Sequence, residues 1–422
     1  MKTTWARDLR KADLKPVEHK DQMKVYVPWG GNENSAIANY RFIEPLLWLK
    51  NRNMLDFLVD KGSMDASKFT NEKVSDLRAT AMGMADVHIY HMIAEPLVIK
   101  LVNEFPGSER PTFIFSSDDN IEWIDPFSDL YPKMGTRSWD GSPLEPGAVL
   151  EYNGAVFYRD GTAGPFVNEK FSVRENIKRL HLHRAMAHEA DGMCVTTPQL
   201  AEVYRAYGAK NIYVYPNSIS FKRYPKVELR EHAPEVRILW QGGSSHFTDL
   251  STVARGLGRV LEQFPNARLI TFGQEFTFLK NSIGIPEDQI EHRDWVDANA
   301  YTYVLSMIGH DINICPLRDI PFNTSKSAIK WYESAAIYNP AATLAANVGP
   351  YQEIEHGETG MLYDDEKEFE ERLSSMIEDE MLRKRLASNA SEWVHEHRDI
   401  AKTAPGLRDW WQETRDRVRK ET

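Results

Sequence analysis

The sequence predicts an α/β protein with two doubly wound, Rossmann-like domains that face each other across a central cleft. Short apolar runs alternate with amphipathic helical patterns along most of the chain, and the alternation starts again after the segment 221–235. A chain of 422 residues is also too long for one ordinary hydrophobic core. Apolar strands separated by helices are typical of parallel sheets that are covered on both faces.

Each half contains short apolar runs with the length and composition of buried strands. Those of the first half are 23–29, 86–93, 112–117, 192–197 and 212–219, and those of the second half are 236–243, 268–273, 312–317 and 342–349. Amphipathic stretches between them predict the covering helices, as at 38–51, 198–208 and 250–265.

The segment 221–235 is charged, contains prolines and has few apolar residues, so it is the best candidate for a linker. We therefore predict an N-terminal, acceptor-side domain over 1–222 and a C-terminal domain over 223–398. A final helix over 399–422 is expected to pack back on the N-terminal domain. The stretch near 118–168 is rich in Pro, Gly, Asp and Trp and is too long for a simple connection, which indicates a functional insertion or lid.

The composition, with 42% hydrophobic and 27% charged residues, is typical of a soluble globular protein. No apolar run approaches the ~20 residues of a membrane span, and the polar start argues against a secretory signal. Cys194 and Cys315 lie in apolar runs and are expected to be reduced packing residues of a cytoplasmic protein. The net charge of −11 argues against indiscriminate nucleic-acid binding, although it leaves room for a local basic groove.

Ligands of doubly wound sheets bind at the carboxyl ends of the strands, and two glycine-rich loops follow predicted strands. In the first, Gly30 and Gly31 allow either a close approach to a ligand or only a tight turn. In the second, the small residues 242–245 lead toward a helix with His246 at its entrance, which suits a phosphate. Neither loop matches a dinucleotide fingerprint or a nucleotide-hydrolysing P-loop.

The stretch 321–337 (PFNTSKSAIKWYESAAI) predicts one helix that begins at a cap within 323–325. Lys326 would then lie in the first turn and Lys330 one turn on, on the same side as Glu333. Positive charge is unfavourable near a helix N-terminus, and a bound diphosphate would offset it. The alternative is that both lysines are solvated and pair with Glu333.

The sequence contains few patterns typical of metal sites or catalytic nucleophiles. The histidines of 181–188 lack the H-E-x-x-H spacing, there is no G-x-S-x-G motif, and no metal site is predicted. Asp118 and Asp119, after the predicted strand 112–117, could hold a divalent cation, bind a sugar hydroxyl or cap a turn.

Several segments occur in an order that is found in one enzyme group: NYRFIEPLLWL, TFIFSSDDN, VTTPQLAEVYRAYG, YPNSIS, LWQGGSSHFTDL, DINICPLRDIPFNTSKSAIKWYESAA and NVGPYQEIEHGETGMLY. The most specific pattern is N-x-x-K-S-x-x-K-x-x-E, followed by a small-residue strand and G-x-x-G. Together these segments resemble the retaining, nucleotide-sugar-dependent glycosyltransferases of the GT-B fold, in the large family 4 group. The insertion also resembles a segment of phage-type members.

The resemblance implies specific roles. Glu333 matches the second glutamate of the E-x7-E motif, which binds the nucleotide ribose, whereas the first glutamate is replaced by Ser325. Asp319 or nearby backbone amides would then contact the sugar. The Arg and Lys that usually follow the glycine loop are absent, and Lys326 and Lys330 would replace them in neutralising the diphosphate.

The remaining implied site residues fall into three groups. Lys326, Lys330, His246 and Asp118 would act in catalysis. The donor, a UDP- or GDP-sugar, would contact Gly30, Gly31, Gly242, Gly243, Ser244, Ser325, Glu333, Gly349, Pro350 and Tyr351. The acceptor would contact Asp119, Trp123 and Tyr131. The implied reaction passes through an oxocarbenium-like state with retention at the anomeric carbon, and it requires no cofactor or metal if lysines and amides stabilise the leaving diphosphate.

The acceptor of the hexosyl or pentosyl group is left open by the sequence. A saccharide, a lipid-linked or a protein acceptor is compatible with it, and hydroxymethylated pyrimidines in DNA are the alternative because aromatic residues of the insertion could line a pocket for a flipped base. A non-catalytic nucleotide- or sugar-binding protein is the alternative from another class, and the oligomeric state is not predicted.

Overall fold

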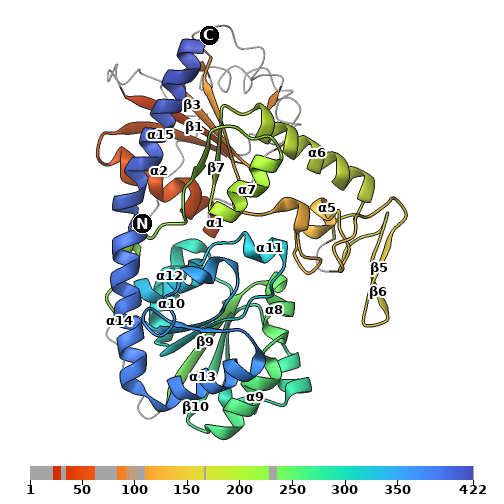
Figure 1. Cartoon of the computed structure of the whole chain (residues 1–422), viewed down its shortest axis with the longest axis vertical. Helices are drawn as coiled ribbons and strands as arrows, with labels where there is room; N and C mark the ends of the chain where they lie inside the picture. Colours follow the sequence, from red (N-terminus) through yellow and green to blue (C-terminus); the bar gives the residue numbers. More distant parts are fainter. Residues whose placement is uncertain are drawn as a thin grey trace. The chain divides into compact units, whose positions relative to one another are not determined.

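A computed structural model describes residues 22–29, 35–61, 83–92, 94, 98–99, 110–165, 168–227 and 235–421. The chain forms two compact units (Figure 1). Unit 1 comprises the described parts of Met1–Asp118 with His181–Pro216 and Ile400–Thr422, and unit 2 comprises Asp119–Leu180 with Asn217–Asp399.

Unit 1 contains a parallel six-stranded sheet in the order β2-β1-β3-β4-β7-β8. The strands are β1 (Met23–Trp29), β2 (Leu55–Lys61), β3 (Val87–His91), β4 (Thr112–Ser116), β7 (Gly192–Val195) and β8 (Ile212–Val214). Its helices are α1 (Ala36–Ala38), the π-helix η1 (Asn39–Ile43), α2 (Glu44–Lys50), α7 (Pro198–Ala206), α15 (Ile400–Glu421) and the second half of α6 (Val173–Glu189). Strand β2 was not among the strands predicted from the sequence.

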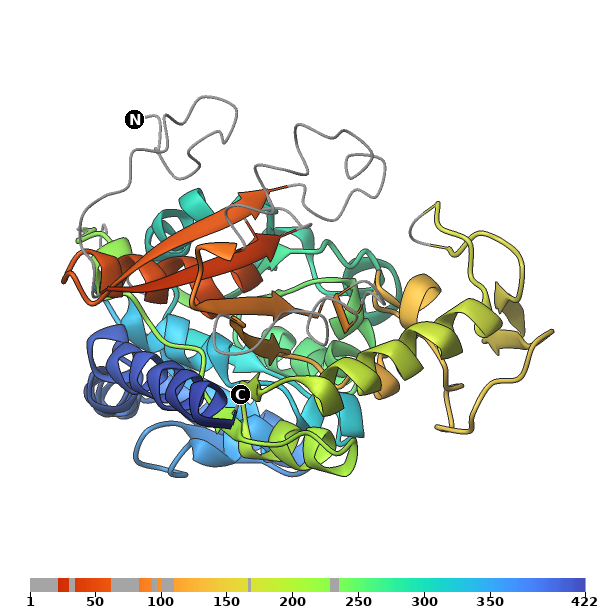
Figure 2. The same ribbon diagram turned by 90° about the horizontal axis from the view of Figure 1, so that it is seen from above.

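The long helix α15, blue in Figure 2, packs against the unit 1 sheet and α2. Its apolar face places Leu407, Trp410 and Trp411 in the same buried cluster as Leu46 and Val25. Burial of such large side chains is the main favourable contribution to the folding of this part of the chain.

Unit 2 contains a second parallel six-stranded sheet, in the order β11-β10-β9-β12-β13-β14. The strands are β9 (Val236–Gly242), β10 (Ala267–Gly273), β11 (Ile290–Asp294), β12 (Ile312–Cys315), β13 (Ala342–Ala346) and β14 (Met361–Tyr363). Strands β11 and β14 were not among the strands predicted from the sequence. Because the chain moves outward from β9 in one direction and then returns to β12 on the other side, the sheet has its topological switch point between these two strands.

Helices flank this second sheet. They are η5 (Phe221–Arg223), η6 (Ser244–His246), α8 (Phe247–Ser251), α9 (Ala254–Gln263), η7 (Leu279–Ile283), η8 (Glu287–Gln289), α10 (Ala298–Ile308), α11 (Pro321–Thr324), α12 (Ile329–Ala336), η9 (Gly349–Glu353), α13 (Glu366–Glu378) and α14 (Glu380–His397). The predicted fold class, two doubly wound α/β domains, is confirmed.

The insertion, residues 119–180, groups with unit 2. It contains η4 (Ile121–Trp123), α5 (Tyr131–Met134) and an antiparallel hairpin of β5 (Val149–Tyr152) and β6 (Ala155–Arg159), yellow in Figure 2. Aromatic rings fill its interior. Phe127 contacts Trp139, Tyr152 and Phe157, with ring centroids 5.0 to 5.4 Å apart.

Candidate functional site

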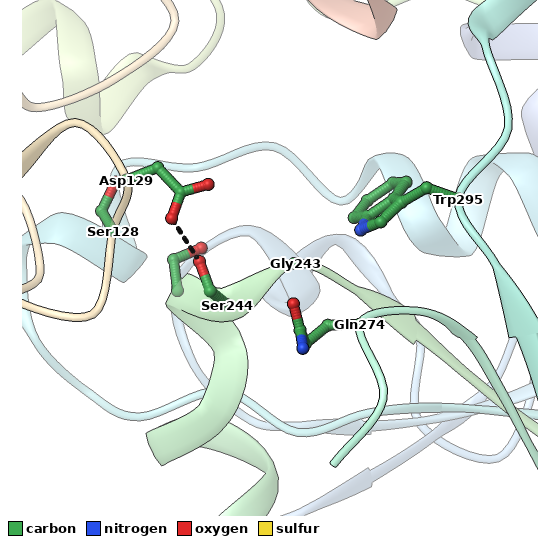
Figure 3. Close-up of a pocket in the computed structure, with 7 residues that line it drawn as sticks. Ser128, Asp129, Gly243, Ser244, Gln274 and Trp295 are labelled. Atoms are coloured by element: carbon green, nitrogen blue, oxygen red, sulfur yellow. Dashed lines mark hydrogen bonds between the residues drawn. The ribbon is translucent and has the colours of Figure 1, made fainter. Parts of the chain in front are cut away.

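The carboxyl ends of β9, β10 and β11 surround a pocket of about 390 Å³ (Figure 3). Its lining comes from the residues that follow each strand and from the insertion: 243–245, Gln274, Trp295, Ser128 and Asp129. The hydroxyl of Ser244 donates a hydrogen bond of 3.0 Å to Asp129 Oδ1. The second glycine-rich loop of the sequence therefore lies at a pocket, as expected for the carboxyl edge of a parallel sheet.

Two glycines permit close contacts at this edge. A Cβ on Gly242 would lie 3.2 Å from Lys330 Nζ and 3.0 Å from His246 Cδ2. A Cβ on Gly273, whose φ is +108°, would lie 2.7 Å from the carbonyl oxygen of Gly242. The ammonium of Lys330 thus lies against the end of β9. A larger residue at position 242 would occupy the space beside it.

The stretch 321–337 does not form the single helix that the sequence predicts. It consists of α11 and α12, which begins at Ile329. Lys326 lies in the turn between the two helices, and Lys330 is the second residue of α12. The two lysines are therefore not one turn apart on a common helix face.

Contacts with other parts of unit 2 explain the interruption. Asn323 Nδ2 donates to Asp249 Oδ1 at 2.8 Å, and Ser325 Oγ donates to its own turn, at the carbonyl of Pro321. A Cβ on Gly349 would lie 2.6 Å from the Cα of Thr324, so another backbone segment also approaches α11 closely. These contacts outweigh helix propensity, which is only a weak preference.

Lys326 and Lys330 are partly buried, and neither ammonium forms an ion pair with any carboxylate in the described parts of the chain. Each ammonium lies near an aromatic ring: Lys326 Nζ is 4.2 Å from the ring centroid of Phe322, and Lys330 Nζ is 5.8 Å from that of Trp240. Burial, together with the charge of Lys326, lowers the pKa of Lys330 to about 8. An anion at this place would stabilise both cations.

His246 is held by a buried carboxylate. Its Nδ1 lies 2.8 Å from Asp249 Oδ2, and the other carboxylate oxygen accepts the backbone N–H of Arg318 at 3.0 Å. Burial alone would raise the pKa of Asp249, but the hydrogen bond from His246 and the nearby positive charge outweigh burial and lower the pKa to about 2. Burial and the two lysines lower the pKa of His246 to about 3, so we assign neutral His246 as the donor through Nδ1.

Arg318 joins the insertion to this network. Its guanidinium forms an ion pair with Asp125 of the insertion, and its Nε lies 3.5 Å from Asp249 Oδ1. Asp125 is 4% exposed, and burial raises the pKa of its carboxyl despite the attraction of Arg318. A paired buried charge of this kind fixes the position of both elements, because separating the partners leaves a charge without compensation.

Glu333 lies inside unit 2 with 4% of its surface exposed. Its Oε2 is 2.8 Å from the hydroxyl of Tyr301 and 3.4 Å from Gln241 Nε2. Burial and the charge of Glu333 raise the pKa of Tyr301 well above its ordinary value, so its hydroxyl stays a donor. The alternative interpretation of the sequence requires Glu333 to pair with the two lysines. In the structure Glu333 forms no ion pair with either of them. Its predicted contact with a ribose stays a prediction.

Four of the other residues predicted to bind the donor lie at the end of α11 or in η9. Ser325 is 3% exposed, and its hydroxyl is hydrogen-bonded within the turn. Gly349, with φ +49°, Pro350 and Tyr351 form the start of η9, which contacts α11. Pro350 and Tyr351 are buried. Gly30 and Gly31 lie outside the described residues.

Asp118, predicted to act in catalysis, lies at the carboxyl edge of the unit 1 sheet, and Asp119, predicted to contact the acceptor, is the first residue of the insertion. Asp118 follows β4, and its Oδ1 is 3.3 Å from Nε2 of His91 at the end of β3. Burial would raise the pKa of Asp118, but the nearby imidazole of His91 and the charge of Arg41 outweigh burial and lower the pKa. Asp119 is the neighbouring, partly exposed carboxylate.

The aromatic residues predicted to contact an acceptor are part of the insertion's own packing. Tyr131 is fully buried and donates its hydroxyl to the carbonyl of Arg137. The Arg137 guanidinium stacks 4.3 Å from the ring centroid of Trp123. We therefore assign no acceptor contact to Tyr131, because its ring has no surface that an acceptor can reach.

Sequence reasoning missed several residues of these networks: His91, Asp125, Asp129, Gln274, Trp295, Tyr301 and Arg318. Gln274 and Trp295 directly follow strands, but β11 was not recognised, so only Gln274 had a strand-end signal. Asp125 and Asp129 lie in an irregular segment where no periodicity indicates which side chains converge.

Two features are absent from the described part of the chain. None of its helices has the length and apolar character that a membrane span requires. Its His, Cys, Asp and Glu side chains do not gather in threes or more in a way that could hold a metal ion.

No protein-family model matches the sequence, and no curated protein is similar to it. Solved structures do share its fold. A sucrose-phosphate synthase from Thermosynechococcus elongatus is 14% identical, with a TM-score of 0.62 over 93% of this chain and 99% of that chain. Anabaena HepE in complex with UDP and glucose is 11% identical, with a TM-score of 0.58 over 93% and 100%.

A glycosyltransferase from Rickettsia africae is a third example, 10% identical with a TM-score of 0.60 over 93% of this chain and 99% of that chain. The similarity extends over both units. At such low identities it establishes the fold, which is the two-domain Rossmann-like fold of GT-B glycosyltransferases.

Proposed function

We propose that this chain transfers a sugar from a UDP- or GDP-sugar to an acceptor, with retention at the anomeric carbon. The donor binds at the carboxyl edge of the unit 2 sheet. One observation carries the proposal: Lys330 lies at the end of β9, the charge of Lys326 acts on it, and neither ammonium has a carboxylate partner among the described residues. The sequence pattern of the nucleotide-sugar transferases supports it, as does the fold shared with a protein solved with UDP and glucose.

The proposed chemistry needs little covalent participation by the protein. The bond between the sugar C1 and the diphosphate oxygen breaks, and negative charge develops on the leaving diphosphate. The acceptor oxygen forms the new bond to C1, and its proton passes to the leaving diphosphate. Lys326 and Lys330 stabilise that charge in a partly buried site, where electrostatic stabilisation is strong. Neutral His246 donates its Nδ1–H to Asp249, so its Nε2 can accept a hydrogen bond without adding charge. Glu333, held by Tyr301, accepts hydrogen bonds from the ribose hydroxyls.

Isothermal titration calorimetry with UDP, GDP, UDP-glucose and GDP-mannose tests the donor site. We expect at least one of these ligands to bind. Lys326→Ala and Lys330→Ala should each weaken binding about 10- to 100-fold, since hydrogen bonds to charged groups contribute roughly 1.5–3 kcal/mol. Lys384→Ala is the matched control, because Lys384 is an exposed lysine that pairs with Glu380 on α14.

Failure of a wider panel of nucleotide sugars to bind would overturn the proposal. Equal affinities in Lys330→Ala and Lys384→Ala would show that the donor site is misplaced. A non-catalytic binding protein would bind the nucleotide sugar but would not release the nucleoside diphosphate from it. Neither transfer to an acceptor nor slow hydrolysis would then be detected. Retention is tested by the anomeric configuration of the product in a proton NMR spectrum.

The acceptor stays open, with a saccharide as one candidate. The alternative that modified DNA is the acceptor remains a prediction from the sequence, and the rings on which it rests pack against each other inside the insertion. The catalytic role of Asp118 is likewise a prediction. Asp118→Asn should lower the turnover rate without changing the affinity for the nucleoside diphosphate.

A further inference from the structure

We propose that Asp129 of the insertion selects the sugar of the donor. Its carboxylate accepts hydrogen bonds from the hydroxyl groups of an uncharged sugar in the pocket of Figure 3. This inference rests on the proposed function and adds to it a class of sugar and a residue that recognises it.

The position of Asp129 is fixed from two sides. Ser244, in the loop after β9, donates to its Oδ1 at 3.0 Å. Four residues earlier, Asp125 forms the ion pair with Arg318 that holds the insertion at the same sheet edge. Asp129 Oδ2 makes no hydrogen bond with any residue that the structure describes, and it points away from Ser244 toward the side of the pocket where Trp295 lies (Figure 3).

The other lining groups suit a sugar. The pocket offers serine hydroxyls, the amide of Gln274 and the ring of Trp295, which is 58% exposed. Hydroxyls and an amide can exchange hydrogen bonds with sugar hydroxyls, and an aromatic face covers the C–H surface of a sugar ring. An ionised carboxylate is an acceptor only, so it requires a partner that donates.

Charge divides the sheet edge into two parts. None of the lysines and arginines that the structure describes lines the pocket, and Asp129 would repel a phosphate placed in it. Lys326 and Lys330, by contrast, favour an anion. The diphosphate therefore belongs beside the lysines and an uncharged, hydroxyl-bearing group belongs beside Asp129. Because the carboxylate also repels negative charge on the sugar, the pocket should discriminate against uronic acids.

Calorimetry with wild type and Asp129→Asn tests this assignment. The ligands are the nucleoside diphosphate, the uncharged nucleotide sugar that wild type binds best, and the matching nucleotide uronic acid. The substitution keeps the shape of the side chain but removes its charge. We expect the ratio of the affinity for the uncharged nucleotide sugar to that for the nucleoside diphosphate to fall about tenfold or more. The affinity for the nucleoside diphosphate itself should change less than about twofold. The preference for the uncharged sugar over the uronic acid should decrease about tenfold.

Asp140→Asn is the matched control, because Asp140 is another insertion carboxylate that accepts hydrogen bonds from serines but does not line the pocket. Ser244→Ala should give a smaller loss in the same direction as Asp129→Asn, since it removes only the anchor of Oδ1. An equal loss for the nucleoside diphosphate and the nucleotide sugar would overturn the inference, because the pocket would then hold the base or ribose. Unchanged sugar affinity would overturn it too, while leaving the proposed function intact.

Discussion

The carboxyl edges of the two sheets compensate their charges in different ways. In unit 1, Asp118 lies 3.3 Å from His91 and near the buried guanidinium of Arg41, so the carboxylate is balanced by its surroundings. In unit 2, Lys326 and Lys330 have no carboxylate partner among the described residues.

The difference indicates what each edge can bind. Partial burial of two cations is unfavourable, and a bound anion would offset this cost. The unit 2 edge is therefore suited to a diphosphate. The balanced unit 1 edge gains little from an added charge and is better suited to orient a neutral group. Three predictions test this contrast, beginning with the largest expected effect.

Asp249→Ala should destabilise the protein by about 3–5 kcal/mol, because it removes the partner of several buried donors. Asp249 is fully buried, and its oxygens accept from His246, Asn323 and the backbone of Arg318. The free energy of unfolding is measured by urea titration with tryptophan fluorescence.

Two variants control this experiment. Asp249→Asn keeps an acceptor oxygen for Asn323 and should cost less than half as much. Asp294→Ala removes a carboxylate whose side chain is 97% exposed and should change stability by less than about 0.5 kcal/mol. If Asp249→Ala is no more destabilising than Asp294→Ala, the buried network does not hold the unit 2 edge.

Donor affinity should fall as pH rises through about 8, the pKa to which burial lowers the Lys330 ammonium. The lysine is mostly charged at pH 7 and loses its proton above its pKa. The affinity for the diphosphate therefore declines by up to about tenfold per pH unit above the pKa of the free protein. The decline levels off above the pKa of the complex, which a bound anion raises. Calorimetric titrations between pH 6.5 and about pH 9.5 measure the decline.

Lys326→Ala sharpens this prediction. The charge of Lys326 is one cause of the lowered pKa of Lys330, so its removal should shift the decline to higher pH while weakening binding at every pH. A decline at an unchanged pH would show that the two ammonium groups do not interact, and a flat profile in wild type would show that Lys330 does not contact the donor.

The sequence predicted the fold well because buried parallel strands produce continuous apolar runs. Nine predicted runs correspond to strands of the two sheets. The missed β11 has the sequence IEHRD and partly exposed side chains, so it lacks an apolar run. The short edge strand β14 has three residues, too few for a periodic pattern. Strands at the edge of a sheet are the ones that apolar periodicity identifies least well.

The candidate site was predicted less completely. Local spacing identified Gly242, Lys330 and Glu333, but it placed Lys326 on a helix that tertiary contacts interrupt at Ser325. No local sequence pattern indicates that Asp129 belongs to the site. Its position depends on a hydrogen bond to Ser244, 115 residues away in the sequence. Contacts of this range are set by the packing of the whole unit, which no motif of a few residues encodes.

The smallest effect is expected at the unit 1 edge. Asp118→Asn should leave the affinity for the nucleoside diphosphate within about twofold and lower the stability by about 1 kcal/mol at pH 7. Because the folded-state pKa of Asp118 is lowered below 3.8, its ionised form stabilises the fold above that pH, and the contribution is lost as pH falls through the folded-state pKa.

The stability difference between wild type and Asp118→Asn should therefore be constant between pH 7 and about pH 5 and close toward about pH 3. Urea unfolding at these pH values measures it, with Asp294→Ala as the exposed-carboxylate control. A difference that grows on acidification would mean that the carboxyl is protonated in the folded state. Donor affinity that falls as strongly as in Lys330→Ala would mean that both edges, and not only the one in unit 2, respond to the charge of the donor.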